Sequence, residues 1–284
     1  MIGPPGAGKT MLARRLPTIL PALTLNEALE TTAVHSLAGL LPPGRSARPT
    51  IPSAMRASSA AAPLRGRVKS VWPRAGVLFL DVLPEFRRHV LEVLRQPLED
   101  GVVCLSRAAV SLSYPARFML AAAMNPCPCG WRGDPTRECH CNPLAIERYL
   151  GRISGPLLDR IDIHLAVPAV AWQDLAVKSE PEEPSSAIRD RVEQARAIQR
   201  ERFQGRPSVR ANAHMTARDI RHHCRLQPDA ESLLRTAMSR LALSARAYHR
   251  VLKIARTIAD LAGAGELEPA HVAEAIQYRA LDRR

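Results

Sequence analysis

The residue types best suited to chemistry stand at the start of the chain. Gly3 to Thr10 read G-x-x-x-x-G-K-T, the pattern of a phosphate-binding P-loop. The glycines let the backbone turn tightly around an anion, and N–H groups of the loop and of the following helix then point at phosphates. The eight-residue match, followed by a helical pattern, disfavours the alternative of a chance glycine-rich turn.

Each P-loop residue has an expected role. Lys9 would reach the β- and γ-phosphates of a nucleotide, and the Thr10 hydroxyl would ligate Mg²⁺. The residues expected to bind the nucleotide are Gly3, Pro4, Pro5, Gly6, Ala7, Gly8, Lys9, Thr10 and Met11.

Cysteines form a second group with possible chemistry. Four of the six lie close together, at Cys127, Cys129, Cys139 and Cys141. Such a cluster in a cytosolic protein indicates metal binding before disulfides. Four thiolates suit a structural, tetrahedral Zn²⁺ with no open position. His140 and Cys104 could compete as ligands, the C-x-C spacing is tighter than usual, and a reduced loop without metal is given equal weight.

Two short apolar runs are expected to be buried parallel strands that position these groups. Residues 76–81 end in Asp81, which would associate with Mg²⁺, and residues 118–125 end in Asn125. A P-loop normally follows such a strand, but only Met1 and Ile2 precede Gly3 here. We therefore expect a truncated chain or a sheet that lacks one of its own elements.

The rest of the first half shows mixed patterns. Helices are expected over 23–40, where Thr24-x-x-Glu27 is a capping box, and over 86–98 and 144–150. Alternation over 101–106 and 109–114 predicts a hairpin, and 163–167 is expected to be a strand. Residues 45–75 hold no period and are expected to be a loop or disordered.

The second half has helical periodicity. An acidic, proline-containing stretch ending at Pro184 suits a linker, and Thr216-x-x-Asp219 is a second capping box. The expected layout is an α/β nucleotide-binding domain over 1–170, a linker over 171–187 and a helical domain over 188–284. Helices are expected at 186–203, 217–224, 229–241, 245–261 and 269–278.

Composition sets broader limits. The chain has 284 residues, is 46% hydrophobic, and carries a net charge of +13 with a pI of about 10.3. No secretory leader or membrane-length apolar run occurs, so the expectation is a cytoplasmic protein without a membrane partner. The basic charge favours DNA or another anionic partner, but a general bias towards Arg is an equally weighted explanation.

Together with the P-loop, several phrases resemble the AAA+ ATPases, and within them the magnesium-chelatase-subunit-I-like group (ComM/YifB-like). The resemblance implies an α/β fold, with a three-layer αβα P-loop domain that binds ATP and Mg²⁺ followed by an all-α lid. The phrases are His35–Leu40, Gly76–Asp81, Leu83–Phe86, Leu94–Glu99, Ala123–Gly130, Ser154–Asp162 and Leu243–Arg250.

The resemblance also implies roles for single residues. Asp81 is similar to the Walker B acid, Asn125 to sensor 1, Arg160 to the arginine finger, and Arg246 to sensor 2. A finger acts on a neighbouring subunit's ATP, so a homo-oligomeric ring, expected to be a hexamer, is implied. The alternatives are a surface ion pair of Arg160 with an adjacent aspartate, and an ordinary arginine of a basic helix for Arg246.

The chain departs from the family pattern at two places. The family reads D-E-L-P-E-F where this chain reads Asp81-Val82-Leu83-Pro84-Glu85-Phe86. Val82 cannot polarise water, so we expect retained nucleotide binding and impaired hydrolysis, since loss of a general base typically costs about 10²–10⁴-fold. Residues 45–75 also depart, and we interpret them as a frameshifted or decayed remnant. The family's N-terminal Lon-protease-like domain is not among the residues of this chain, so we expect a fragment of a longer ancestor.

Three functions remain open on these grounds. One is an ATP-driven motor acting on DNA in recombination and natural transformation, which the cysteine phrase at 127–130 favours. The second is a chelatase-type motor acting on a protein partner. The third is a nucleotide-binding relic without hydrolysis, which Val82 and the altered 45–75 segment favour.

Overall fold

The computed structural model describes residues 1–22, 54–58, 76–107, 110–170, 183–206, 209–241 and 243–279. The chain divides into two compact units, which are described separately. One comprises residues 1–160 and 166–182, and the other comprises residues 161–165 and 183–284. The predicted helix over 23–40 and its capping box at Thr24 and Glu27 lie outside the described residues.

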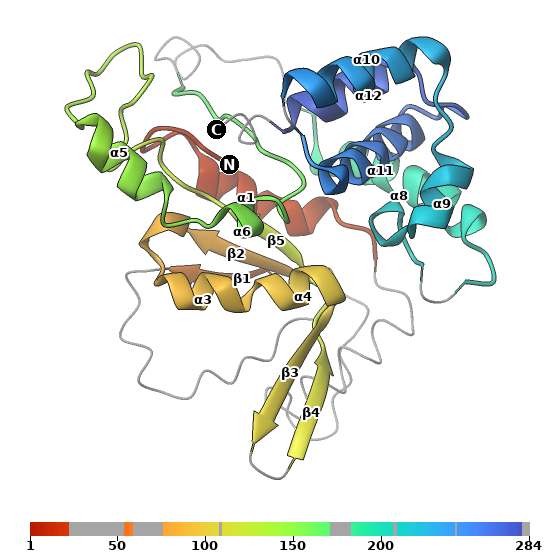
Figure 1. Ribbon diagram of the computed structural model, residues 1–284, viewed down its shortest axis with the longest axis horizontal. Coiled ribbons are helices and arrows are strands. Elements are labelled where there is room, and N and C mark those ends of the chain that lie inside the picture. The colour runs from red at the N-terminus through yellow and green to blue at the C-terminus, as the bar shows by residue number, and fades with distance from the viewer. Residues whose placement is uncertain are drawn as a thin grey trace. The chain divides into compact units, whose positions relative to one another are not determined.

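A parallel sheet is the centre of the first unit (Figure 1). Its strands are β1 (Ala54–Ser58), β2 (Val77–Asp81) and β5 (Met119–Ala122), in the order β1-β2-β5. Ile2 adds parallel bridges to Met124 and to Ala166. The chain entering the P-loop therefore continues the sheet beyond β5, which positions the loop at the carboxyl end of the neighbouring strands.

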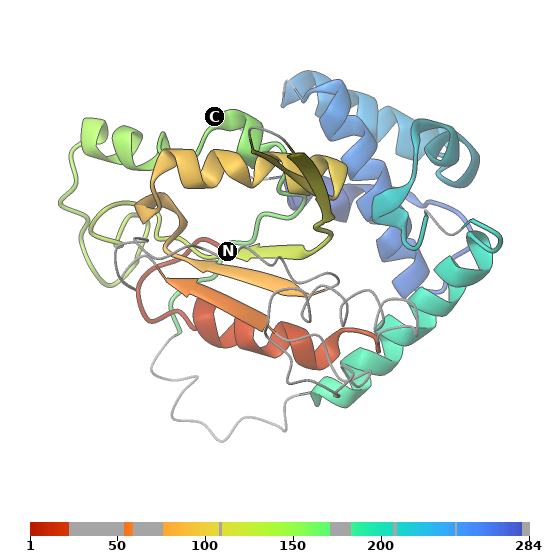
Figure 2. The same cartoon turned by 90° about the horizontal axis from the view of Figure 1, so that it is seen from below.

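Helices cover both faces of this sheet. Figure 2 shows α1 (Lys9–Ile19) on one side of β1 and β2, with α3 (Arg88–Val93) and α4 (Arg95–Asp100) on the other. The four apolar residues of β2, Val77 to Leu80, are all buried, as expected for a strand covered twice. Val77 and Phe79 pack with Ala13 of α1. The mixed α/β class predicted from the sequence is confirmed for this unit.

Residues 45–75 were expected to lack regular structure, and this is wrong for β1. Ala54 to Ser58 pair in parallel with Val77 to Asp81. A neighbouring strand supplies the backbone hydrogen bonds whatever the side-chain period, so a five-residue strand can form without a visible pattern. The other residues of 45–75 lie outside the described residues.

Two other predictions of the first half also need correction. A 3₁₀ turn (Leu83–Glu85) precedes the helix expected over 86–98, which is divided into α3 and α4, and Pro97 lies in the first turn of α4 instead of ending a helix. Proline is tolerated there because first-turn N–H groups have no helical partner. Residues 163–167 form no strand, only the isolated bridge at Ala166.

The predicted hairpin is confirmed. Strands β3 (Val102–Arg107) and β4 (Val110–Pro115) pair antiparallel and extend beyond α4 in Figure 1. Short helices α5 (Pro143–Leu150) and α6 (Gly155–Leu158) follow β5.

The second unit is helical in its described residues, close to the predicted bounds. Buried apolar residues on α10 and α11, such as Leu234, Val251 and Ala255, form its core. The capping box of Thr216 and Asp219 is present at the start of α9. The helices are α8 (Ser185–Arg202), α9 (Ala217–His223), α10 (Pro228–Arg240), α11 (Ala245–Leu261) and α12 (Pro269–Gln277).

Among the described residues, no helix combines the length and the apolar character that crossing a membrane requires.

Candidate functional site

The P-loop forms a tight turn that ends at the start of α1. Gly6 and Gly8 have φ values of 81° and 79°, in the left-handed region that glycine adopts without strain. Gly8 is the N-cap of α1, and the N–H of Leu12 donates to its carbonyl over 2.9 Å. The unpaired N–H groups of the first helical turn give this end of α1 an affinity for anions.

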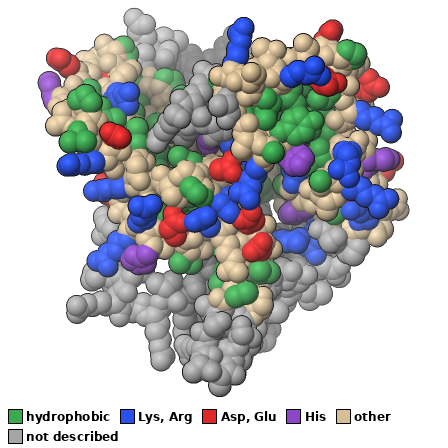
Figure 3. Space-filling model, in the orientation of Figure 1, with side chains coloured by type: hydrophobic (Ala, Val, Ile, Leu, Met, Phe, Trp, Pro, Cys, Tyr) green, Lys and Arg blue, Asp and Glu red, His purple; other side chains and the backbone are tan. Residues whose placement is uncertain are grey.

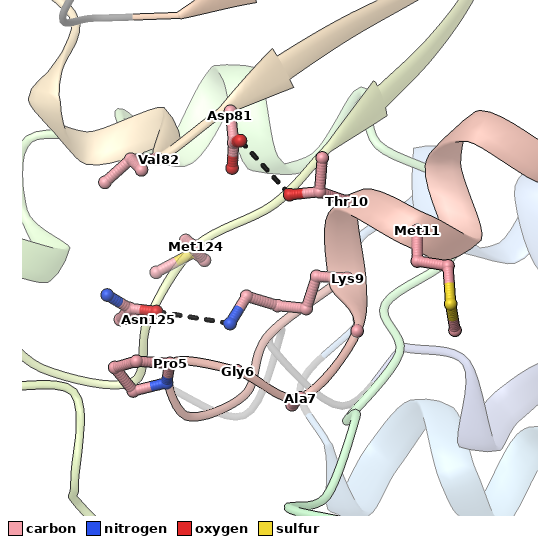
Figure 4. A pocket seen from close by; sticks show the side chains of 11 residues that line it. Pro5, Gly6, Ala7, Lys9, Thr10, Met11, Asp81, Val82, Met124 and Asn125 are labelled. Carbon is pink, nitrogen blue, oxygen red and sulfur yellow. Dashed lines mark hydrogen bonds between the residues drawn. The ribbon is translucent and has the colours of Figure 1, made fainter.

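A pocket of about 360 Å³ opens over this loop (Figure 4). It combines the loop with the carboxyl ends of β2 and β5. Of the residues expected to bind a nucleotide, Gly3 and Pro4 do not line it and instead contribute their carbonyls to Lys9. The lining residues are Pro5, Gly6, Ala7, Gly8, Lys9, Thr10, Met11, Asp81, Val82, Met124 and Asn125.

Lys9 extends back across the loop. Its ammonium donates to the carbonyls of Gly3 and Pro4, each over 2.7 Å, and to Oδ1 of Asn125 over 3.2 Å. Partial burial lowers the pKa of Lys9, and the carboxylate of Asp81 acts in the opposite direction. The cation is thus held at the centre of the loop, between the helix and β5 (Figure 4).

Thr10 and Asp81 present two oxygen atoms on one side of the pocket. Oγ1 of Thr10 donates to Oδ2 of Asp81 over 3.2 Å, and Figure 4 shows the two groups facing each other. A hydroxyl and a carboxylate beside a phosphate-binding loop fit Mg²⁺, which takes few protein ligands and keeps several waters. This donor set therefore matches the metal that a bound nucleotide requires.

Val82 follows Asp81 and lines the same pocket. Its φ of 53° and ψ of 56° make it the one non-glycine residue with positive φ in the part of the chain that the structure describes. A β-branched residue is strained in this region, at a cost of about 1–3 kcal/mol. The conformation is maintained by the following turn, where the N–H of Leu83 donates to the carbonyl of Ala123 and that of Glu85 to Val82.

Asn125 is held by its backbone as well as through its side chain. Tyr149 on α5 hydrogen-bonds with the Asn125 backbone, and burial raises the pKa of this tyrosine while the hydrogen bond offsets part of the rise. Sequence reasoning missed Tyr149, since no pattern connects it with residue 125.

Two arginines with expected roles occupy different units. Arg160 pairs with Glu99, and its guanidinium also donates to the carbonyl of Pro156 over 2.7 Å. The side chain of Arg160 is only 7% exposed, whereas that of Glu99 is 42% exposed, so only the arginine of this pair is buried, and its partner is Glu99 instead of an adjacent aspartate. Arg246 lies in the first turn of α11, in the helical unit.

The four clustered cysteines meet in space. Their sulfur atoms all lie within 4.8 Å of one another, and this group includes neither Cys104 nor His140. The distances are 3.4 Å from Cys127 to Cys129, and 3.6 Å from Cys139 to each of those two. A tetrahedral zinc site with bonds of about 2.3 Å has edges of about 3.8 Å between sulfurs, so the arrangement fits this metal.

Backbone N–H groups support negative charge on these sulfurs. The N–H of Gly130 donates to Sγ of Cys127 over 3.2 Å, and that of Cys129 to Sγ of Cys141 over 3.4 Å. A hydrogen bond from the backbone of Trp131 is the largest of the effects that lower the pKa of Cys129 to about 6. Cys139 and Cys141 differ: although each has a backbone hydrogen bond that acts in the other direction, burial and the neighbouring thiol groups raise the pKa of Cys139, and that of Cys141 to about 12.

The surface charge is mixed on the face shown in Figure 3. Lys and Arg side chains occur over both units, and Asp and Glu side chains lie among them. Beside α5, however, four arginines and Glu85 line a second pocket of about 420 Å³. These arginines are Arg87, Arg88, Arg148 and Arg152.

Comparison with known proteins agrees with this geometry over both units. The family model described as magnesium chelatase, subunit ChlI, matches residues 1–175. The model described as magnesium chelatase, subunit ChlI C-terminal, matches residues 182–279.

Curated relatives are similar over almost the whole chain. Competence protein ComM of Haemophilus influenzae is 41% identical over 291 residues, which cover 99% of this chain and 55% of the relative. Uncharacterized protein YifB of Salmonella typhimurium is 40% identical over 292 residues, covering 100% of this chain and 56% of that protein. Uncharacterized protein Rv2897c of Mycobacterium tuberculosis is 41% identical over 288 residues, covering 98% and 56%.

The chain thus spans about half the length of the curated relatives it matches. It belongs to the magnesium chelatase subunit I family of AAA+ P-loop proteins, in the ComM/YifB-like group.

Proposed function

We propose that this chain binds ATP with Mg²⁺, hydrolyses it weakly, and acts on DNA. The observation that carries the proposal is the convergence of Lys9, Thr10, Asp81 and Asn125 on one pocket at the carboxyl ends of parallel strands. There Lys9 exchanges its carbonyl acceptors for phosphate oxygens. Thr10 and Asp81 would hold Mg²⁺, which would neutralise charge on the phosphates, and Asn125 would orient the attacking water.

This pocket lacks a general base at the expected position. Val82 occupies the position where a carboxylate would polarise the water, and an isopropyl group cannot accept a proton. Glu85 is exposed and lines the arginine-rich pocket instead, so it does not take over this role. Binding without efficient turnover is the expected behaviour of such a site.

The proposal includes an assembly. We assign residues 1–170 to the AAA+ core, 171–187 to a linker and 188–284 to a lid that carries Arg246 as sensor 2. In a homo-oligomeric ring, expected to be a hexamer, Arg160 acts on the nucleotide of a neighbouring subunit. Arg160 must then leave Glu99, and the two anions compete for one guanidinium.

DNA is the favoured partner for three reasons. One relative is named for competence, and the chain carries a net charge of +13. The arginine-rich pocket beside α5 offers several fixed cations for backbone phosphates. The family model's name favours a second candidate, a chelatase-type motor on a protein partner. The third candidate, a relic that binds nucleotide only, rests on Val82.

The test combines nucleotide and DNA binding with turnover. A fluorescent ATP analogue is titrated against the purified chain with Mg²⁺, and phosphate release is followed with and without single-stranded DNA. We expect saturable nucleotide binding, very slow turnover, and stimulation of the residual turnover by DNA. Binding that is unchanged in Lys9→Ala would overturn the assigned site.

The DNA arm has its own control. Arg148→Glu with Arg152→Glu should weaken DNA binding and reduce its salt dependence by about 0.7 per lost phosphate contact on a single strand. Arg235→Glu with Arg240→Glu, at two exposed positions of α10, is the control of equal charge change and should change neither. If both variants lose the same DNA affinity, the net charge of the chain attracts DNA without a defined binding surface. If neither variant loses affinity, the assignment of DNA as the partner is wrong.

A further inference from the structure

The cysteine cluster begins two residues after Asn125. Cys127 is completely buried, and its Sγ and its carbonyl both accept the N–H of Gly130, over 3.2 and 3.1 Å. The turn from Cys127 to Gly130 is therefore compact, and only Pro126 separates it from Asn125, whose side chain bonds Lys9.

Gly130 connects this turn with the P-loop. A Cβ built on Gly130 would lie 2.6 Å from Cδ and 2.7 Å from Cγ of Pro5, and 3.7 Å from Cγ of Asn125. Its φ of 90° also requires glycine. The backbone at Gly130 thus lies directly against the Pro5 ring, which lines the nucleotide pocket.

The other end of the cluster leads into α5. Cys141 is followed by Asn142, the N-cap of α5, whose Oδ1 accepts the N–H of Ala145 over 2.7 Å. Tyr149 on that helix hydrogen-bonds with the Asn125 backbone. Both ends of the cysteine loop therefore come back to the same residue of the pocket.

Little besides the sulfur atoms holds the loop together. Residues 126–142 contain no helix or strand. The local contacts at its tip, the turn made by Asp134 and the guanidinium of Arg137 at 4.3 Å from the Trp131 ring, do not reach the sheet. A segment of this kind needs a metal or another cross-link to acquire a fixed conformation.

We propose that the four thiolates hold one structural Zn²⁺, and that this metal fixes Asn125 and Pro5 in the nucleotide pocket, so that nucleotide affinity depends on zinc occupancy. The inference rests on the proposed nucleotide binding at the P-loop. The zinc site has no open coordination position, so its effect on the pocket is one of positioning.

The experiment measures zinc content and nucleotide affinity separately on the full chain. Elemental analysis should give one zinc per chain. Gradual removal with a chelator, at each step followed by titration of a fluorescent ATP analogue, should lower the affinity about tenfold or more, and added Zn²⁺ should restore it. Cys139→Ser should lose the zinc and show the low affinity, while Cys224→Ser, a buried cysteine outside the cluster, should retain both properties.

A second variant keeps the conclusion independent of a folding defect. Gly130→Ala retains all four thiolates but disturbs the contact with Pro5, so it should hold zinc and still bind nucleotide more weakly. Chains without zinc as purified that also take up none when it is added would overturn the metal assignment. Full nucleotide affinity in the zinc-free chain, or in Gly130→Ala, would overturn the coupling. A chain that holds one zinc but binds no nucleotide would contradict the proposed function instead, with the zinc result unaffected.

Discussion

The two sides of the nucleotide pocket differ in how well their residues suit their backbone. On the P-loop side, the left-handed positions are occupied by Gly6 and Gly8, which adopt them without strain. On the β2 side, the left-handed position after Asp81 is occupied by Val82, which is one of the residue types least suited to it. Hydrogen bonds connect the two sides: Lys9 of the P-loop donates to Asn125, and Thr10 donates to Asp81 at the end of β2.

This difference separates binding from hydrolysis. The residues proposed to bind phosphate and metal have the side chains and the conformations that these roles require. Residue 82, at the position proposed to activate water, carries no carboxylate, and its left-handed backbone is fixed by the hydrogen bond from the Leu83 N–H to the Ala123 carbonyl. In the part of the pocket proposed to bind the nucleotide, residue type, backbone conformation and proposed role therefore agree. In the part proposed to activate water they do not.

The largest expected effect is on turnover. Val82→Glu supplies the missing base at a backbone position that already has the geometry for it, and should raise ATP hydrolysis by about 10²–10⁴-fold. Val82→Gln is the matched control, since it has nearly the same shape without a proton acceptor of this strength. Phosphate release under saturating ATP measures both. Equal turnover in the two variants would show that the defect lies elsewhere, in assembly or in the 45–75 segment.

Loss of the loop cation should have the next largest effect. Lys9→Ala removes the donor that interacts with Gly3, Pro4 and Asn125, and should weaken ATP binding by about 2–5 kcal/mol. Isothermal titration with and without Mg²⁺ measures this. Lys253→Ala, which removes a lysine of the helical unit, should leave the affinity unchanged.

The capping box at the start of α9 can be compared with the two sides of the pocket. Here the residue types, Thr216 and Asp219, suit the backbone conformation that they adopt. Asp219 accepts hydrogen bonds from Arg206, the Thr216 N–H and the Thr216 hydroxyl, and the interaction with Arg206 is the largest cause of its strongly lowered pKa. Asp219→Asn should cost about 1–2 kcal/mol of unfolding free energy at neutral pH, with a discount because Arg206 is partly exposed.

This contribution has a defined pH dependence. Because folding lowers the pKa of Asp219, its stabilisation is present above the unfolded pKa of about 3.9 and is lost as the pH falls towards the folded value. Urea unfolding of wild type and Asp219→Asn should therefore converge at low pH. A gap that stays constant with pH would assign the effect to shape instead of charge.

The smallest expected effect is the release of strain at residue 82. Val82→Asn should stabilise the chain by about 1 kcal/mol, since asparagine tolerates the left-handed region and a β-branched residue does not. Val82→Ile keeps the branching and should gain nothing. Urea denaturation compares the three chains, and turnover should remain at the wild-type level in both variants because neither side chain is a base.

Much of the site was predictable from short-range patterns. The P-loop, the strand ending in Asp81, the hairpin and the C-terminal helices each follow from residues near one another in the sequence, whose spacing matches a turn, a strand or a helix. Asp81 and Asn125 could be paired with Lys9 and Thr10 because parallel strands end at one edge of a sheet.

The features that were missed depend on contacts across the fold. Strand β1 exists through its pairing with β2, and the guanidinium of Arg160 has Glu99 as its partner, 61 positions away in the sequence. The left-handed conformation of Val82 is imposed by the turn after it, against the residue's own preference. No local pattern in the sequence contains this information, and the same holds for the approach of Gly130 to Pro5.

The hydrogen bonds of Lys9 have a consequence for the kinetics and heat of ligand capture. Two of its three acceptors lie at the start of the loop and the third is Asn125 after β5, so Lys9, at the end of the loop, links it to its own start and to the sheet, and the loop keeps a defined shape by itself. Capture of a triphosphate is then an exchange of one set of acceptors for another, with little chain ordering to be done. We expect rapid association, limited mainly by diffusion and orientation, and a modest enthalpy, because each bond gained by the incoming phosphates replaces one that the lysine already makes.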